Sequence, residues 1–374
     1  MTPDEPAAKI LEIVPYPPPF TGWATRAYFV HKALQQMGHQ CVVLNMGNNR
    51  KIPSNEYECV RSGWKYVGKI LVYLSRGYTL HLHANGGSPK GFFLCLIAYF
   101  MTLSIFRRPQ LTFHAGIEQI FFPRANSRKM VPILRLLFGI PKVVICNNSD
   151  VKARIVEYSI NPTKVIAITP FSKQYVADAP SEISTEIKDF IRNHSPIIFT
   201  YLELRPEHAP EPLFQGMASV AKVIPEIGFI LVGATNEREA LQRLLEQAGI
   251  AEQTFHVGAV SHSLFLSLLR QSTVYLRSNQ REGTSSSIRE SLYLGTMVIA
   301  NDKGDHPEGV ITYPWGDGKA IGETLLGFLQ NPRKLAAEAG DIPDTVGLEA
   351  ELLARSALGQ SGKELAFRDK YNVL

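Results

Sequence analysis

The sequence predicts an α/β protein of two consecutive doubly wound, Rossmann-like domains that face each other across a cleft. The chain has 374 residues, enough for two domains of about 100–200 residues each. In both halves short apolar strands alternate with helical stretches, the pattern of a parallel sheet covered on both faces. A polar, acidic segment at 177–195 separates the two series and predicts the linker. We therefore expect an N-terminal domain at 1–180 and a second domain at 181–350.

In the first half, the predicted strands are apolar runs bounded by polar or turn-forming residues, at 9–14, 40–45, 79–83, 110–114, 142–146 and 164–169. The helices between them have apolar residues at helical spacing, at 25–37, 88–106, 128–138 and 150–158.

The alternation restarts after Pro196. The predicted strands are 197–202, 228–233, 254–257, 274–277 and 297–300. The predicted helices are 211–223, 237–247, 262–270 and 287–294. In such sheets ligands bind beyond the carboxyl ends of the strands, and here also between the domains.

Composition excludes several classes of protein. Apolar residues make up 45% and charged residues 20% of the chain, which excludes a largely disordered chain, a collagen-like repeat and a disulfide miniprotein. Four cysteines, none in a C-x-x-C pair, indicate a reducing compartment. The first eight residues lack the basic start and apolar run of a signal peptide, so we expect a cytoplasmic protein.

The longest apolar run, 92–106, has 15 residues, whereas a membrane-spanning helix needs about 20. We expect a buried helix there, with a helix that touches a membrane surface as the alternative.

The charge is unevenly distributed. Residues 1–180 carry 21 Lys/Arg and 9 Asp/Glu, whereas 181–374 carry 18 and 25. A basic first half favours an anionic membrane surface, nucleic acid or an anionic substrate, but no nucleic-acid-binding motif accompanies the charge. Four cations surround the apolar stretch 130–140: Arg124, Arg128, Lys129 and Arg135. This arrangement predicts contact with the inner leaflet of the cytoplasmic membrane or, alternatively, a solvated helix face.

Several enzyme motifs are missing from the sequence. The first strand is not followed by G-x-G-x-x-G, and no G-x-x-x-x-G-K-[ST] occurs, which disfavours a nicotinamide-dependent dehydrogenase and a P-loop NTPase. No H-E-x-x-H, cysteine–histidine cluster or D-x-D triplet occurs, so neither a zinc site nor an aspartate-held metal is expected.

The segment 281–290 holds the densest group of residues suited to chemistry. It follows a predicted strand and opens a predicted helix, where free amide groups and the positive end of the helix dipole favour a phosphate. Glu282 and Glu290 frame it and can accept hydrogen bonds from sugar hydroxyls. Ser287 and Glu290 also have the spacing of a capping box, the alternative role for Glu290. The residues between the glutamates are small enough to let a ligand approach the backbone: Gly283, Thr284, Ser285, Ser286 and Ser287.

The block from Glu282 to Glu290, followed by 291–300, resembles the E-x7-E signature of family-4 retaining glycosyltransferases. In that family a small-residue helix, a glycine and the next strand follow the second glutamate. The resemblance extends in order over about 320 residues, including strand ends at 113–116, 144–154, 229–233 and 255–258.

This resemblance implies a GT-B architecture with a nucleotide-sugar donor held by the second domain and an acceptor facing the first. It implies that Glu282 contacts donor sugar hydroxyls, Glu290 the ribose, and the amides of 284–286 the diphosphate or sugar. Gly22 would lie near the phosphates and His114 would approach the donor sugar. Residues 351–374 would cross back as a helix onto the first domain.

The sequence departs from the family pattern after the first strand of the second domain. The family has an Arg and a Lys there that clamp the diphosphate, and Glu203 and His208 occupy those positions here. A glutamate repels a phosphate. Arg205, or His208 when protonated, would then supply the positive charge.

Three histidines of the first half are candidates for a role. His81 and His83 lie two apart on a strand and face the same side. No third metal ligand occurs nearby in the sequence, so we expect them to be structural or to line a substrate site. His114 is either a core histidine or, by its position in the resemblance, a catalytic-site residue.

The resemblance implies a metal-independent, retaining hexosyltransferase without a cofactor, acting in bacterial polysaccharide or glycolipid synthesis. A sugar would move from a nucleoside diphosphate sugar to a glycan or lipid-linked acceptor. Two alternatives remain: a catalytically impaired GT-B partner subunit, suggested by Glu203 and His208, and a nucleotide-sugar epimerase.

Overall fold

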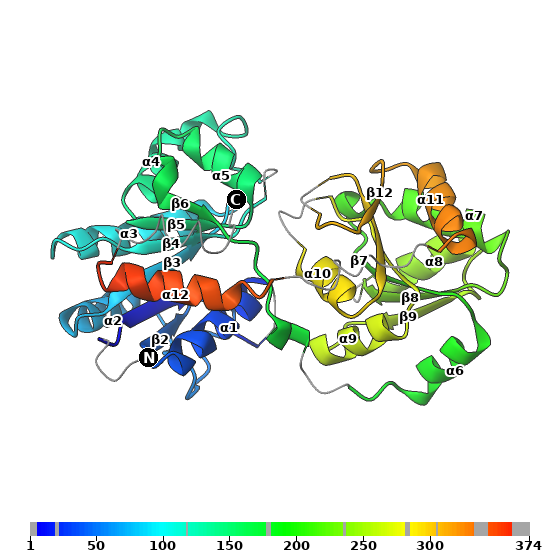
Figure 1. The fold of residues 1–374 in the computed structure, drawn as a ribbon, viewed down its shortest axis with the longest axis horizontal. Coiled ribbons are helices and arrows are strands. Elements are labelled where there is room, and N and C mark those ends of the chain that lie inside the picture. The colour runs from blue at the N-terminus through cyan, green and yellow to red at the C-terminus, as the bar shows by residue number, and fades with distance from the viewer. Residues whose placement is uncertain are drawn as a thin grey trace. The chain divides into compact units, whose positions relative to one another are not determined.

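The computed structural model describes residues 6–18, 22–116, 119–176, 181–234, 237–280, 285–303, 306–332 and 343–360. The chain divides into two units (Figure 1). The first contains Met1–Ser172 and Asp344–Leu374, and the second contains Lys173–Pro343. Each unit holds a parallel sheet with helices, so the predicted class of two Rossmann-like α/β domains is confirmed.

The first unit is built on a six-stranded sheet of order β2-β1-β3-β4-β5-β6, in which all neighbours are parallel. Its strands are β1 (Lys9–Val14), β2 (Gln40–Asn45), β3 (Thr79–Ala84), β4 (Gln110–Phe113), β5 (Val143–Cys146) and β6 (Val165–Ala167). Its helices are α1 (Gly22–Gln36), α2 (Gly63–Ser75), α3 (Pro89–Leu103), α4 (Val131–Gly139), α5 (Ser149–Val156) and α12 (Val346–Ala357), with 3-10 turns η1 (Arg128–Met130) and η2 (Pro162–Lys164).

The second unit is built on a parallel sheet of order β12-β11-β10-β7-β8-β9. Its strands are β7 (Ile197–Leu202), β8 (Gly228–Gly233), β9 (Thr254–Gly258), β10 (Val274–Arg277), β11 (Met297–Asn301) and β12 (Ile311–Tyr313). Its helices are α6 (Thr185–Asn193), α7 (Pro210–Ala221), α8 (Arg238–Ala248), α9 (His262–Arg270), α10 (Ser286–Tyr293) and α11 (Gly318–Gln330), with 3-10 turns η3 (Lys173–Val176) and η4 (Pro206–His208).

Helix starts are fixed by the residues that precede them. Ser88 accepts a hydrogen bond from the Gly91 amide at the start of α3, and Pro89 occupies a position where no amide hydrogen is needed. The side chains of Asn148 and Ser261 cap α5 and α9 in the same way. These polar residues directly before apolar periodic segments explain why most predicted helix starts lie within a few residues of the observed ones.

The last described helix belongs to the first unit. Helix α12 packs against α1, and its Glu349 carboxylate accepts a hydrogen bond from Arg26 of α1 at 2.7 Å. The predicted C-terminal segment was 351–374, whereas the helix observed is Val346–Ala357 and residues 361–374 lie outside the described ranges.

The sequence analysis missed or misplaced several elements. Helix α2, strand β12 and helix α11 were not predicted, and the segment assigned as linker contains α6. The unit boundaries observed are 172/173 and 343/344, compared with the 180/181 and 350/351 predicted. Helix α6 is held by its Ser184 cap, by the buried Ile187 and by Phe190, whose ring centre lies 5.5 Å from that of Phe255.

Candidate functional site

The second unit presents the start of α10 close to the carboxyl end of β10. Ser285 is the N-cap of α10 with extended backbone, and its hydroxyl lies 2.8 Å from that of Ser287 rather than on a helix amide. The Ser287 hydroxyl also lies 3.0 Å from that of Tyr275 on β10. This first turn therefore keeps the electrostatic character that favours an anion.

Residues Glu282, Gly283 and Thr284, predicted to contact the donor, lie outside the described residues. Ser285 and Ser286 are described, at the N-cap and the first position of α10.

Glu290 lies inside α10 and is buried. Its carboxylate lies 3.3 Å from Nε2 of His262, the first residue of α9. The alternative of a capping box is wrong, because α10 begins at Ser286 and Ser287 is already inside the helix. Glu290 is therefore a buried acid that faces the neighbouring helix rather than the start of its own.

The loop after β7 holds the predicted phosphate-binding cations. Arg205 is exposed and its Nε lies 2.9 Å from the Glu203 carboxylate. His208 is buried, and its Nδ1 accepts a long hydrogen bond from the Glu203 amide at 3.5 Å. Because β7 and β10 are neighbours, the sheet brings this loop beside the β10–α10 junction, and the Gln280 amide donates to the Glu207 carbonyl at 3.0 Å.

Sequence reasoning missed a buried cation at the same edge of the sheet. Arg277 is the last residue of β10, only 4% exposed, and its guanidinium lies 5.4 Å from the ring centre of Tyr201 on β7. The Tyr201 hydroxyl donates to Glu203 at 2.7 Å. A cation at the final position of an apolar strand, where the parallel strands end, was the signal that would have identified it.

In the first unit, Gly22 begins α1, and a Cβ built at this position would meet no atom of the described residues within 4 Å. Trp23, the next residue, stacks on the His114 ring with centroids 4.8 Å apart and an interplanar angle of 21°. His114 follows β4, and its amide donates to the Ala84 carbonyl at the end of β3. Gly22 and His114 thus lie on segments joined by one aromatic contact.

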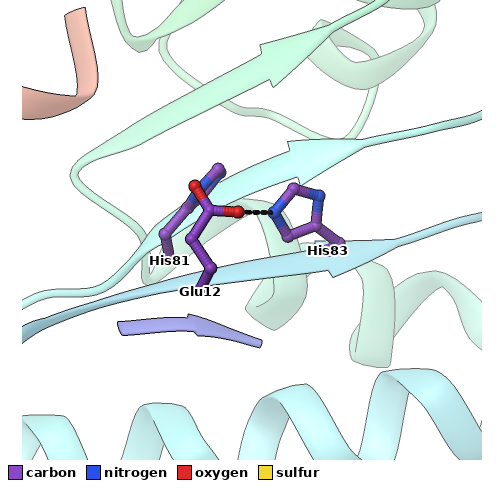
Figure 2. A group of neighbouring side chains, drawn as sticks. All are labelled: Glu12, His81 and His83. Carbon is purple, nitrogen blue, oxygen red and sulfur yellow. Dashed lines mark hydrogen bonds and ion pairs between the residues drawn. The ribbon is translucent and has the colours of Figure 1, made fainter. Parts of the chain in front are cut away.

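A chain of buried polar side chains connects to His114, and Figure 2 shows three of its members, Glu12, His81 and His83. The Glu12 carboxylate on β1 lies between two histidines of β3, 3.2 Å from Nδ1 of His81 and 3.2 Å from Nε2 of His83. His83 Nδ1 in turn lies 2.7 Å from His114 Nε2. On the other side, His81 Nε2 lies 2.8 Å from the Thr112 hydroxyl. The prediction that His81 and His83 face the same side is confirmed.

Burial and hydrogen bonding set the charges in this chain. Burial would raise the pKa of Glu12, but the attraction of His81 and the hydrogen bonds from both histidines outweigh it and lower that pKa well below its usual value. Burial, helped by repulsion from His81, lowers the pKa of His83 to about 4. Burial followed by repulsion from His83 also lowers the pKa of His114 well below its usual range. At neutral pH Glu12 is therefore charged, and His83 and His114 are neutral.

Neutral His83 fixes which nitrogen of His114 carries the proton. Glu12 is an acceptor, so His83 donates through Nε2 and accepts through Nδ1. His114 must then donate through Nε2, which leaves its Nδ1 as an acceptor.

Glu12, His81 and His83 are also the one group among the described residues whose ligand atoms lie close enough together, within 4.8 Å, to hold a metal ion. The third ligand missing from the sequence neighbourhood is supplied by Glu12, because β1 and β3 are adjacent. Imidazole nitrogen and carboxylate oxygen are ordinary ligands of Zn²⁺. Each oxygen of the Glu12 carboxylate already accepts a hydrogen bond from a histidine. A metal ion at this position would have to replace both hydrogen bonds.

The four cations predicted to face a membrane are all exposed. Arg128 and Lys129 form η1, and Arg124 and Arg135 donate to the Glu157 and Tyr158 carbonyls after α5. In the described part of the chain, no helix combines the length and apolar character needed to cross a bilayer. The 15-residue α3 has Phe92, Leu96 and Tyr99 buried.

Residues 184–318 match the family described as Glycosyl transferases group 1. The matched region lies within the second unit. It contains the loop after β7, Arg277 and helix α10. No curated protein sequence matches the chain at a significant level.

Solved structures share the fold over nearly the whole chain. HepE of Anabaena, in a complex with UDP, has a TM-score of 0.66 and 15% identity over 96% of this chain and 99% of its own. A glycosyltransferase from Rickettsia africae has a TM-score of 0.69 and 14% identity over 96% and 99%. A UDP-N-acetylglucosamine 2-epimerase has a TM-score of 0.63 and 9% identity over 95% and 98%. These similarities show the GT-B fold.

Proposed function

We propose that the protein is a retaining glycosyltransferase that takes a sugar from a nucleoside diphosphate sugar, without a metal ion or cofactor. The observation that carries this proposal is the group 1 domain at 184–318, whose α10 holds a buried acid, Glu290, one turn beyond an amide-rich helix start. HepE shares the fold over nearly its whole length and was solved with UDP. This supports UDP as the leaving group of the donor.

The residues of the second unit suit such a donor. The start of α10 would hold the diphosphate, because amide groups and the helix dipole stabilise the charge that develops as the bond to the sugar breaks. Arg277 would add positive charge at the same sheet edge, in place of the clamp that Glu203 interrupts. Glu290 would bind ribose hydroxyls, and Glu282 those of the sugar.

The acceptor belongs to the first unit in this proposal, with His114 as the polar group on the donor sugar. Retention would follow from attack on the same face of the sugar, with the departing phosphate as the base. The product would be a glycan or glycolipid of bacterial polysaccharide or glycolipid synthesis.

The first experiment measures thermal stabilisation of the purified protein by UDP, GDP and ADP and their sugar conjugates. A ligand that binds only the folded state raises the melting temperature as its concentration exceeds Kd. We expect one base to do so, with the effect lost in Glu290→Gln and kept in Glu323→Gln, an exposed control on α11. Stabilisation by none would contradict the proposal and favour a partner subunit.

Incubation with the donor then separates transfer from isomerisation. A transferase passes the sugar to an acceptor with its anomeric configuration retained and with EDTA present. The fold shared with the 2-epimerase makes isomerisation the second candidate, and it would convert the sugar nucleotide without any acceptor. Transfer left unchanged by both Glu282→Ala and Glu290→Gln would exclude the assigned site.

Membrane contact is proposed for η1, whose Arg128 and Lys129 are exposed beside the apolar α4. Each cation near an anionic surface contributes about 1 kcal/mol. Sedimentation with vesicles containing phosphatidylglycerol should fall in Arg128→Gln/Lys129→Gln. The control Lys188→Gln/Arg192→Gln removes the same charge from α6 of the second unit and should sediment as the parent does.

A further inference from the structure

The first unit contains a cavity of about 320 Å³ at the carboxyl ends of its central strands. Ile13 of β1, Met46 after β2 and Ala84 of β3 line it, as do Trp23 of α1 and Tyr66 of α2. Because β2, β1 and β3 are consecutive in a parallel sheet, their ends meet at one edge, where open α/β sheets bind ligands. Its volume is that of a small-molecule site.

Two cations stand at this cavity, one on each side of β1. Arg50 follows β2 and is half-buried, with Nη1 donating to the Gly47 carbonyl at 3.2 Å, and Lys90 lies in the first turn of α3. Neither forms an ion pair within the described ranges of the chain. Among the residues that the structure describes, no Asp or Glu lines the cavity, and both oxygens of the Glu12 carboxylate are within hydrogen-bond distance of His81 and His83. The described lining of the cavity therefore carries positive charge.

The remaining wall is mainly apolar, and α3, which contributes to it, also exposes apolar side chains. Ile13, Leu82 and Leu94 line the cavity. On the same helix, Phe93, Ile97 and Phe100 repeat at helical spacing and are 53%, 44% and 56% exposed. A ligand with one anionic group and an apolar body matches both features.

We propose that this cavity binds the acceptor, and that the acceptor is an amphiphile whose phosphate lies between Arg50 and Lys90 with its apolar body against α3. The inference rests on the proposed function in one respect, namely that the ligand is the acceptor of the transferred sugar. Trp23 and His83 also line the cavity and both contact His114, so a ligand there would lie beside the residue assigned to the sugar.

The test uses the full-length protein and isothermal titration calorimetry. The probe is dibutyryl phosphatidic acid, a soluble phosphate with an apolar body, compared with glycerol 3-phosphate and inorganic phosphate. We expect the phosphatidic acid to bind at least tenfold more tightly than either phosphate alone. Equal affinity for glycerol 3-phosphate would overturn the proposal that the ligand is an amphiphile. Tightest binding of inorganic phosphate would overturn it too, because the cavity would then be a simple anion site.

The variants assign the binding to the cavity. Arg50→Gln/Lys90→Gln should weaken binding at least tenfold. The single variant Arg50→Lys keeps the charge and should bind within about threefold of the parent protein. The control Lys51→Gln/Lys65→Gln removes two neighbouring charges that do not line the cavity and should stay within twofold. Equal loss in both double variants, or no loss in the first, would overturn the proposal. Met46→Trp, which adds volume at a lining position of the cavity, should also abolish binding.

Nucleotide stabilisation separates failure of this inference from failure of the proposed function. UDP should still raise the melting temperature of the Arg50→Gln/Lys90→Gln protein. In the transfer assay this variant should have a higher KM for the acceptor and an unchanged KM for the donor. Binding of phosphatidic acid by a protein that no nucleotide stabilises would support the cavity and contradict the transferase. Nucleotide stabilisation without phosphatidic acid binding would do the reverse.

Discussion

His83 Nδ1 lies 2.7 Å from His114 Nε2, and this contact fixes the protonation of a candidate site residue from the inside of the sheet. Glu12 holds His83 through Nε2, so the proton on His114 is held at Nε2 and Nδ1 remains an acceptor. Replacing Glu12 by Gln supplies an amide that both donates and accepts. The side chain at position 12 then no longer determines which nitrogen of His83 and of His114 carries the proton.

We therefore predict a single tautomer for His83 and His114 in the parent protein, with the proton on Nε2 of each. Nitrogen-15 imidazole spectra report it directly. Glu12→Gln should give mixed tautomers at both rings and leave the distant His256, bonded to the Gly233 carbonyl, unchanged. A proton on Nδ1 of His114 in the parent would contradict the assignment.

The low pKa of His83 predicts how stability changes with pH. The folded-state pKa is about 4, below the 6.5 of the unfolded chain, so the unfolded chain takes up the proton first as the pH falls. The contribution of His83 to the free energy of unfolding is therefore constant above about pH 6.5. It falls by roughly 3 kcal/mol as the pH is lowered toward 4. Glu12, with its lowered pKa, acts in the same direction below about pH 4.5.

Urea unfolding at pH 7 and at pH 4 tests this, with His83→Asn as the comparison. The difference in unfolding free energy between parent and variant should shrink as the pH falls. A difference that stays constant over the range would show that His83 titrates as in the unfolded chain.

Much of the fold was predictable because the period of apolar residues and the capping residues are local signals. Strands β8 and β10 and helix α9 have the predicted bounds. Helix α2 was missed because Tyr66, Ile70, Tyr73 and Leu74 are buried in a helix that also exposes Trp64 and Leu71, which blurs the periodicity.

The site was harder to predict, because its contacts cross the sheet. His81 and His83 are two residues apart and their shared side was predictable, but Glu12 is 69 positions from His81 and reaches it only through the pairing of β1 with β3. The same limit applies to Glu290 and His262, which meet because α9 and α10 pack together.

The buried ion pair between Arg26 and Glu349 predicts that α12 is required by the first unit. Both side chains are 1% exposed, and Arg26 also donates to Asn147 at 2.8 Å. Glu349→Gln leaves a buried cation without its counter-charge and should cost about 3–5 kcal/mol. Glu351→Gln on the same helix removes a partly exposed partner of Arg355 and should cost less than about 1 kcal/mol.

Urea unfolding followed by fluorescence measures both variants, and the two units are analysed as separate transitions where the curve requires it. Equal small losses for the two variants would show that the pair contributes little to the attachment of α12.

The glycine that ends β8 predicts a large effect of one methyl group. Gly233 has a φ of +98°, and a Cβ built there would lie 2.1 Å from the Leu202 carbonyl oxygen of the neighbouring strand. Gly258, at the end of β9, has a φ of +82° and only one atom near 4 Å. Alanine is strained at both positions, so Gly258→Ala controls for backbone strain alone. Gly233→Ala should lose clearly more stability, by more than about 1 kcal/mol, and equal losses would mean that β7 and β8 separate without cost.

The contact between Glu290 and His262 separates a ligand role from a structural one. If Glu290 serves only the packing of α9 on α10, then Glu290→Gln and His262→Gln should lose similar stability, since each removes one partner of the same 3.3 Å contact. If Glu290 binds the donor, only its replacement should weaken UDP binding. We expect the second result, with a loss of at least tenfold in Glu290→Gln, which corresponds to about 1.4 kcal/mol.

A double-mutant cycle with calorimetry completes the argument. The stability cycle measures the coupling of the two side chains, and the UDP cycle should show no coupling, because His262 takes no part in the ligand contact. Weakening of UDP binding to the same extent in both single variants would place the donor role on the pair rather than on Glu290.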